Sequence, residues 1–204
     1  MADKALMTTL VCCLAVNGSL PLPLAVLILG RDVSLAVAAI YYRYASLPAP
    51  KTLRRYWDFS LPSAEVHPTT ISKLNTFLQL GLIGTTLCVS LLHDPSAINS
   101  AAGELLMKMQ SSLGGMEGVE RIVKSMQGVV MATTVYSGFS YMWTKDAVKI
   151  LGDDEVLKRK QGFRGRMILG GSFGVMVLGA GWLAWNERTR REAGEEEVEA
   201  QSQD

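Results

Sequence analysis

The stretch "LAVLILGRDVSLAVAAIYYRYA", residues 24–45, decides the fold. It is apolar over the ~17–25 residues that a helix needs to cross a bilayer. It nevertheless carries Arg31 and Asp32 near its middle. A charged side chain at the centre of a membrane helix costs about 2.5–3.5 kcal/mol on insertion scales, so such residues usually face a cavity or a partner. The stretch therefore predicts a membrane-spanning helix with a polar site partway along it.

Four further apolar segments predict spanning helices: residues 5–16, 74–92, 128–144 and 167–186. The first of them is short, and it spans only if Asp3 and Lys4 lie at the membrane interface. Gly170 and Gly174 have the GxxxG spacing that lets two membrane helices approach closely. Together the five segments predict an all-α integral membrane helical bundle with about five spanning helices.

The composition agrees with a membrane protein. Of the 204 residues 49% are hydrophobic and 19% are charged, whereas soluble domains average about 25% charged residues. A net charge of +1 argues against a nucleic-acid partner, because nucleic-acid binding usually needs a basic face. Cys12, Cys13 and Cys88 lie in apolar runs without the spacing of a disulfide framework or a zinc site, so we expect buried, inert thiols.

The pattern of polar segments divides the chain into three parts. Residues 1–151 form the predicted membrane domain, with a polar insertion at 93–127 whose middle contains two short amphipathic segments. Residues 152–186 form a basic loop followed by an additional membrane helix. Residues 187–204 are acidic and lack aromatic residues, which predicts a disordered tail.

The distribution of lysine and arginine predicts the orientation in the membrane. With five spans, Lys4, the basic residues after Tyr42 and those of the 145–166 loop fall on one side, and that side holds most of the basic residues. The positive-inside rule assigns such a side to the cytoplasm or the matrix. Asp3 lies on the same side.

Two clusters of charge have both a structural and a functional interpretation. Arg31 and Asp32 lie about 100° apart around a helix, so they are not expected simply to neutralise each other, and either interhelical salt bridges or a functional site is possible. Lys51, Arg54 and Arg55 precede a helix whose cap is Thr69 or Thr70 and whose first turn carries Lys73. Such a basic helix start suits a phosphate pocket, although solvated interface charges fit the pattern equally well.

Several stretches resemble a known family. They are "MADKALMTTL" (1–10), "LPLPLAVLILGRDVSLAVAAIYYRY" (20–44), "LPAPKTLRRYWDFSLPSAEVHPTTISKLNTFLQL" (47–80) and, more loosely, "YSGFSYMWTKDAVKI" (136–150). Together they are similar to the later two-thirds of eukaryotic, fungal-type cardiolipin synthases, which belong to the CDP-alcohol phosphatidyltransferases. The mid-helix Arg-Asp pair and the run "PTTISKLNT" carry most of this resemblance.

The resemblance implies a function and a set of site residues. It implies transfer of a phosphatidyl group from CDP-diacylglycerol to phosphatidylglycerol, giving cardiolipin and CMP, with a divalent metal, Mg²⁺ or Mn²⁺. It implies that Asp3 is the general base and a candidate metal ligand. It implies a substrate-binding set of Lys4, Arg31, Asp32, Arg54, Arg55 and Lys73. The expected location is the mitochondrial inner membrane with the active face toward the matrix, and the expected partners are membrane lipids and a second copy of the chain.

The chain departs from the family pattern at its start. The family signature, Asp-x-x-Asp-Gly-x-x-Ala-Arg followed by Asp-x-x-x-Asp, matches only through its last Asp, at Asp3. We therefore expect a chain that begins inside the catalytic motif and lacks both the family's first two helices and the other metal ligands. Whether such a chain is active by itself is left open. The alternatives are a non-catalytic membrane protein or a transporter-like bundle in which Arg31 and Asp32 line a pathway. No inverted repeat supports the transporter.

Overall fold

The computed structural model describes residues 2–47, 56–58, 65–66, 69–92, 101–143, 148–149 and 155–202. Its helices are α1 Ala2–Val16, α2 Leu22–Ser46, α4 Thr70–Leu92, α6 Ala101–Ser112, α7 Gly115–Trp143 and α8 Glu155–Ser202. Two strands of two residues each, β1 Glu65–Val66 and β2 Val148–Lys149, complete the described part. The predicted all-α bundle is therefore confirmed.

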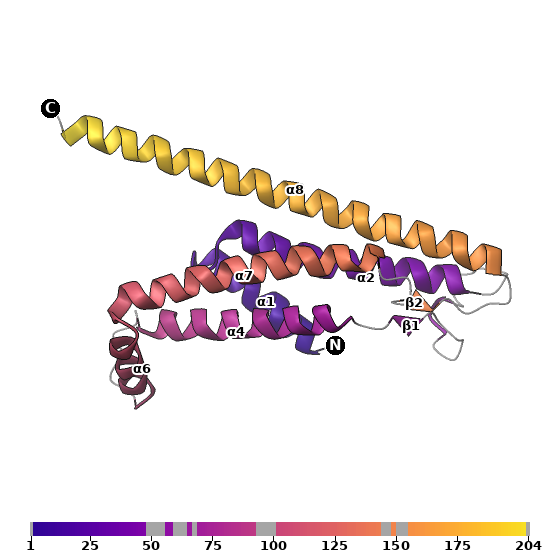
Figure 1. The fold of residues 1–204 in the computed structure, drawn as a ribbon, viewed down its shortest axis with the longest axis horizontal. Coiled ribbons are helices and arrows are strands. Elements are labelled where there is room, and N and C mark those ends of the chain that lie inside the picture. The colour runs from indigo at the N-terminus through magenta and orange to yellow at the C-terminus, as the bar shows by residue number, and fades with distance from the viewer. Residues whose placement is uncertain are drawn as a thin grey trace.

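The helices lie largely alongside one another. Figure 1 shows α8 extending along the length of the molecule beside α2 and α7, with α4 on the other side of α7 and α6 at one end. The core between α1, α2, α4 and α7 is apolar and includes Val11, Leu24, Ile28, Leu82 and Val130. These side chains are almost fully excluded from the surface, so burial of apolar area holds the four helices together.

Three of the described helices are long and apolar enough to cross a membrane: Leu22–Ser46, Thr70–Leu92 and Lys160–Arg190. The prediction of five spans exceeds this number. The apolar part of α1, Lys4–Val16, is a shorter helix. The predicted span at 128–144 falls on α7, which is not among these three helices. Its buried face carries the polar residues Thr134, Ser137 and Ser140, which lower the hydropathy of the helix.

The breaks between helices follow from local sequence chemistry. Gly18 has a positive φ of 72°, a conformation that glycine adopts without a Cβ penalty, and it turns the chain between α1 and α2. Thr69 caps α4, because its Oγ1 accepts a hydrogen bond of 3.2 Å from the backbone N–H of Ser72. Of the two threonines proposed as the cap, Thr69 is therefore the one that acts.

Glycines let α8 pack closely against its neighbours. A Cβ at Gly30 of α2 would lie 2.7 Å from the Cβ of Met176, and a Cβ at Gly170 would lie 2.6 Å from the sulfur of Met142. A Cβ at Gly138 of α7 would likewise clash with the ring of Phe173 on α8. Only half of the predicted GxxxG pair takes part, since nothing lies within 4 Å of a Cβ at Gly174. The close packing of α8 on α2 and α7 instead depends on one glycine from each helix: Gly30 on α2, Gly138 on α7 and Gly170 on α8.

Several expectations for the polar segments are wrong. The predicted loop through residue 166 is helical from Glu155, and the predicted disordered tail continues α8 to Ser202. Glutamate, alanine and arginine are good helix formers, and an i,i+4 pair joins Arg188 Nε to Glu192 at 2.9 Å. The second amphipathic segment of the 93–127 insertion is the first part of α7, whereas the first is α6.

The three cysteines are also placed differently from the prediction. Cys12, Cys13 and Cys88 are exposed on the surface of the bundle. An apolar run in a membrane helix is apolar on its lipid-facing side as well as on its core side. Apolar neighbours therefore did not identify the buried face.

The strand pair joins two connections that are distant in sequence. Glu65 pairs with Lys149 and Val66 with Val148 in an antiparallel register. The connection before α4 and the connection before α8 therefore lie at the same end of the bundle, as Figure 1 shows. The order of the five predicted spans placed both connections on one membrane side, and the pairing agrees with that placement.

Candidate functional site

Arg31 is buried within the bundle although it carries a charge. Its residue exposure is 6%. Its Nη1 donates to Asp32 Oδ1 at 2.7 Å, and its Nη2 donates to the hydroxyl of Ser72 on α4. The third donor, Nε, is buried without a hydrogen-bond partner. A buried polar atom without a partner is costly, so this donor marks a place where a ligand atom would be stabilised.

The pairing of Arg31 with Asp32 corrects the sequence prediction. Adjacent helical positions point about 100° apart, which led us to expect that the two charges would not neutralise each other. The arginine side chain is long enough to reach across that angle and place Nη1 on the neighbouring carboxylate. The ion pair between Arg31 and Asp32 lies within α2, so it is not one of the salt bridges between helices that the structural interpretation predicted. The link to another helix is made by Ser72.

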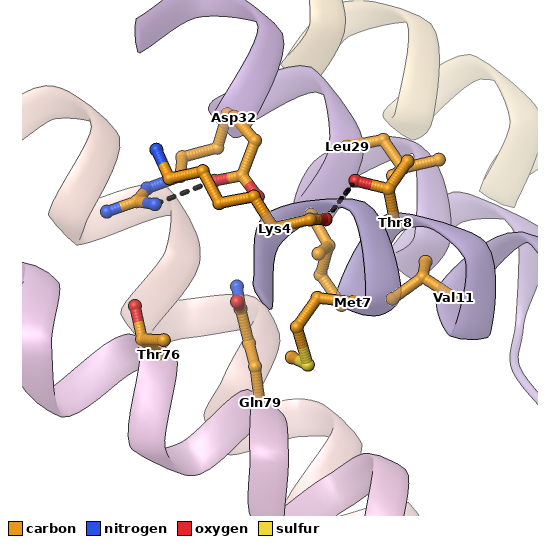
Figure 2. Close-up of a pocket in the computed structure, with 10 residues that line it drawn as sticks. Lys4, Met7, Thr8, Val11, Leu29, Asp32, Thr76 and Gln79 are labelled. Atoms are coloured by element: carbon orange, nitrogen blue, oxygen red, sulfur yellow. Dashed lines mark hydrogen bonds and ion pairs between the residues drawn. The ribbon is translucent and has the colours of Figure 1, made fainter. Parts of the chain in front are cut away.

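A cavity of about 80 Å³ lies between α1, α2 and α4 next to Arg31. Its lining residues are Lys4, Met7, Thr8, Val11, Ile28, Leu29, Arg31, Asp32, Thr76 and Gln79. Figure 2 shows Lys4 and Asp32 on one side of this space, Thr76 and Gln79 facing them from α4, and Met7 and Val11 along the α1 side. The cavity therefore combines a charged and polar end with apolar walls.

The charges of the lining favour an anion. Lys4 and Arg31 contribute two positive charges, and Asp32 contributes one negative charge that is already paired with Arg31. The side chain of Asp32 is 34% exposed, whereas that of Arg31 is 7% exposed. Arginine presents several donors in a planar fork that matches phosphate or carboxylate oxygens. A phosphate group that accepts a hydrogen bond from Arg31 Nε and forms an ion pair with Lys4 would supply the missing partner of Arg31.

The other residues predicted for the site are placed less completely. Lys73 is exposed at the start of α4 and does not line the cavity, although its neighbour Ser72 bonds Arg31. Arg54 and Arg55 lie outside the described residues, as does the side chain of Asp3, whose backbone belongs to α1. Lys4 and Arg31 thus line the same cavity, and the roles predicted for Asp3, Lys73, Arg54 and Arg55 stay predictions.

Sequence reasoning missed a buried polar network beside the cavity. Asn75 and Gln79 on α4 and Thr134 on α7 are almost fully buried. Gln79 Nε2 donates to Thr134 Oγ1 at 3.2 Å, and Thr134 donates to Asn75 Oδ1 at 3.0 Å. Thr133 also donates to Asn75 Oδ1, at 2.9 Å. The available signal was the helical spacing of Ser72, Asn75, Gln79 and Thr86 in an otherwise apolar segment.

The described residues do not form a metal site. They contain no group of three or more His, Cys, Asp and Glu side chains that could hold an ion. At the cavity Asp32 is the described carboxylate, and its Oδ1 is already bonded to Arg31. Mg²⁺ and Mn²⁺ need several oxygen ligands, so this lining does not fit a divalent cation.

Comparison with known proteins identifies the relatives of the chain. It is 40% identical over 156 residues to a cardiolipin synthase (CMP-forming) / mitochondrial hydrolase fusion protein of Schizosaccharomyces pombe, a match that covers 76% of this chain and 22% of the relative. The cardiolipin synthase (CMP-forming) of Homo sapiens is 38% identical over 98 residues, covering 48% of this chain and 33% of the relative. No model of a protein family and no solved structure matches the chain.

A probable cardiolipin synthase (CMP-forming) of Drosophila melanogaster is 46% identical over 87 residues, which are 43% of this chain and 27% of that relative. The chain thus spans between about a fifth and a third of the length of these relatives. The resemblance that the sequence motifs predict is confirmed, and the chain is homologous to CMP-forming cardiolipin synthases, over 76% of its length in the Schizosaccharomyces pombe fusion protein.

Proposed function

We propose that this chain takes part in the synthesis of cardiolipin. The reaction transfers a phosphatidyl group from CDP-diacylglycerol to a hydroxyl of phosphatidylglycerol and releases CMP. The homology to cardiolipin synthases supports this assignment, and the anion-favouring cavity between α1, α2 and α4 agrees with a phospholipid substrate. Within that reaction the cavity binds the phosphate of the acceptor lipid.

One observation carries the proposal. Arg31 is buried beside a cavity and keeps a donor, Nε, without a partner. Burial strengthens a charge-assisted hydrogen bond to a phosphate oxygen, because the local dielectric constant is low. The bonds to Asp32 and Ser72 fix the guanidinium, so the phosphate does not have to order it on binding.

The remaining roles follow from the family resemblance. Asp3 lies one residue before Lys4 on α1, and in the proposal its carboxylate removes the proton from the attacking hydroxyl. A base has to lie within about 2.6–3.2 Å of that hydroxyl. Lys73, Arg54 and Arg55 extend the positive charge around the phosphate. Asp32 holds the guanidinium of Arg31 rather than the substrate.

A divalent metal, Mg²⁺ or Mn²⁺, belongs to the proposal through the resemblance. When bound, such an ion neutralises charge on the transferred phosphate. The cavity lining described above does not hold such an ion, so we assign none of its residues to the metal and derive no step through it. Loss of activity in EDTA, restored by Mg²⁺ or Mn²⁺, would support the requirement.

The location and the assembly are also proposals. Three long apolar helices make the chain an integral membrane protein. We assign it to the mitochondrial inner membrane with the cavity toward the matrix, in keeping with the side that carries most basic residues. A homodimer completes the proposal. Fractionation of mitochondria with protease protection tests the location, and crosslinking in intact membranes tests the dimer.

A chimera tests the proposed function. The segment of the Homo sapiens relative that matches this chain is replaced by the corresponding residues of this chain, and CMP release is measured with CDP-diacylglycerol and phosphatidylglycerol. We expect an active chimera. Because Arg31→Gln removes a desolvated charged contact worth about 2–3 kcal/mol, kcat/KM for phosphatidylglycerol should fall roughly 30- to 150-fold.

Two comparisons complete this test. Leu80→Ala changes an exposed side chain next to Gln79 and should leave turnover unchanged. The KM for CDP-diacylglycerol should change little in Arg31→Gln, because the residue binds the acceptor. A folded chimera that releases no CMP, or an Arg31→Gln variant with unchanged acceptor kinetics, would contradict the proposal.

A further inference from the structure

The amide of Gln79 is held in one orientation by a relay of hydrogen bonds. Thr134 has a single hydroxyl proton, which it donates to Asn75 Oδ1 at 3.0 Å. The Thr134 oxygen therefore accepts, and the donor is Gln79 Nε2 at 3.2 Å. Asn75 and Thr134 are 0% exposed, so water does not compete for these bonds. In this arrangement the nitrogen of the Gln79 amide faces Thr134, and its oxygen is the other end.

The oxygen of that amide is available to a ligand. With Nε2 directed at α7, the remaining polar atom is Oε1, and no described residue donates a hydrogen bond to it. Gln79 lines the same cavity as Lys4 and Arg31. Figure 2 shows its amide end pointing from α4 into the space below Lys4 and Asp32. Gln79 therefore offers an uncharged hydrogen-bond acceptor beside the donors of Lys4 and Arg31, whereas the carboxylate of the lining, Asp32, is paired with Arg31.

Donors and an acceptor together specify a ligand more closely than charge alone. Arg31 Nε and the Lys4 ammonium are donors suited to phosphate oxygens. Gln79 Oε1 is suited to a donor on the ligand, and in a phospholipid headgroup without an amine that donor is a hydroxyl. Met7, Val11, Ile28 and Leu29 give the cavity apolar walls, which favour a lipid over a small soluble phosphate ester.

We infer that Gln79, oriented by Thr134 and Asn75, accepts a hydrogen bond from the headgroup hydroxyl of the acceptor phospholipid and thereby determines headgroup specificity. This inference rests on the proposed function, because it takes the cavity as the acceptor site. It adds the chemical feature that the site recognises. A site that hydrogen-bonds a hydroxyl discriminates against an analogue that lacks it, since the analogue leaves a buried polar group without a partner.

The test compares two lipids that differ only in hydroxyl groups. Phosphatidylpropanol keeps the phosphodiester and the three headgroup carbons of phosphatidylglycerol but lacks both hydroxyls. The full chain is placed in phosphatidylcholine nanodiscs, and its affinity for short-chain forms of each lipid is measured by calorimetric titration. Because one hydrogen bond is at stake, we expect phosphatidylglycerol to bind about tenfold more tightly.

Variants assign the preference to Gln79. Gln79→Met keeps the length of the side chain without the amide, and it should lower phosphatidylglycerol affinity to that of phosphatidylpropanol, whose affinity should not change. Thr134→Val should reduce the preference because the amide is no longer oriented, and Thr134→Ser should restore it. If Gln79 and Thr134 had only a structural role, their substitution would weaken the binding of both lipids alike, and valine and serine at position 134 would have the same effect.

Each outcome bears on one proposal. Equal binding of both lipids by the unmodified chain overturns the role of Gln79 but leaves phosphate binding by Arg31 intact. Failure to bind either lipid, or equal binding by the unmodified chain and Arg31→Gln, overturns the proposed function instead. Glycerol 3-phosphate is a third ligand. If it binds as tightly as phosphatidylglycerol, the assignment of a lipid ligand is wrong.

Discussion

The side chains of Arg31 and Ser72, 41 residues apart in sequence, are joined by a hydrogen bond from Nη2 to the serine hydroxyl. The bond links α2 to the first turn of α4. Ser72 is itself fixed, because its backbone N–H donates to the capping Thr69 Oγ1. The guanidinium is thus oriented by a serine from one helix and an aspartate from its own, and its Nε is the donor left over.

This relationship predicts the effect of Ser72→Ala. The substitution removes one of the two groups that orient Arg31 while keeping the charge. We expect phosphatidylglycerol affinity to fall about three- to tenfold, since one hydrogen bond contributes about 0.5–1.5 kcal/mol. Ser125→Ala on the exposed face of α7 is the control and should not change the affinity. Unchanged affinity in Ser72→Ala would mean that Asp32 alone orients the guanidinium.

The close approach of α8 predicts which glycines are intolerant of substitution. Gly138→Ala would place a Cβ against the Phe173 ring, and overpacking of this kind costs about 1–3 kcal/mol. Gly174→Ala meets nothing within 4 Å and should be neutral or slightly stabilising in a helix. Thermal unfolding in detergent measures both. A lower melting temperature for Gly174→Ala than for Gly138→Ala would contradict the packing of α8 on α7.

These contacts show why the fold was only partly predictable from sequence. Hydropathy located residues 24–45, 74–92 and 167–186 as apolar helices, because the length of an apolar run depends on composition alone. It did not show which glycine faces a neighbour, since that depends on the rotation of α8 about its axis. Gly170 and Gly174 have the same spacing in any helix, but only Gly170 contacts Met142.

The buried network between α4 and α7 predicts a contribution to stability. Asn75→Leu removes the acceptor of two threonine hydroxyls and leaves an apolar side chain of similar size. Because hydrogen bonds between membrane helices average about 0.6 kcal/mol and reach about 1.7 kcal/mol, we expect a loss in that range for each bond. Thr9→Ala, on the exposed face of α1, is the control in the same unfolding assay. Equal stability of both variants would contradict a stabilising network.

The candidate site was predictable where a charge sits in an apolar run. Arg31 and Asp32 were identified in this way, since a charge in a membrane helix is costly and conspicuous. Lys4 was assigned through the family resemblance. Gln79 was not identified, because an uncharged amide in a helix is a common core residue. Its role depends on Thr134, 55 residues away in sequence, and no local pattern joins the two.

The pairing of β1 with β2 predicts a crosslink. Val66 and Val148 are direct partners in the strand register, so cysteines at the two positions should form a disulfide on mild oxidation. The background is a chain with Cys12, Cys13 and Cys88 replaced by serine. Cysteines at Val66 and Ser112 form the control pair, because α6 lies at the opposite end of the bundle. Crosslinking of the control pair but not of Val66 with Val148 would contradict the arrangement of the two ends.

The final prediction concerns this 204-residue chain expressed alone. We expect it to insert in membranes and bind phosphatidylglycerol but to release no CMP. The proposed transfer uses divalent metal ions, which need several carboxylate oxygens, and at the cavity the described carboxylate is Asp32, already paired with Arg31. Purified chain is incubated with CDP-diacylglycerol, phosphatidylglycerol and Mg²⁺ or Mn²⁺, with heat-treated chain as the blank and the active chimera as the positive control. CMP release above the blank that disappears in Arg31→Gln would show that residues other than those described here supply the metal ligands.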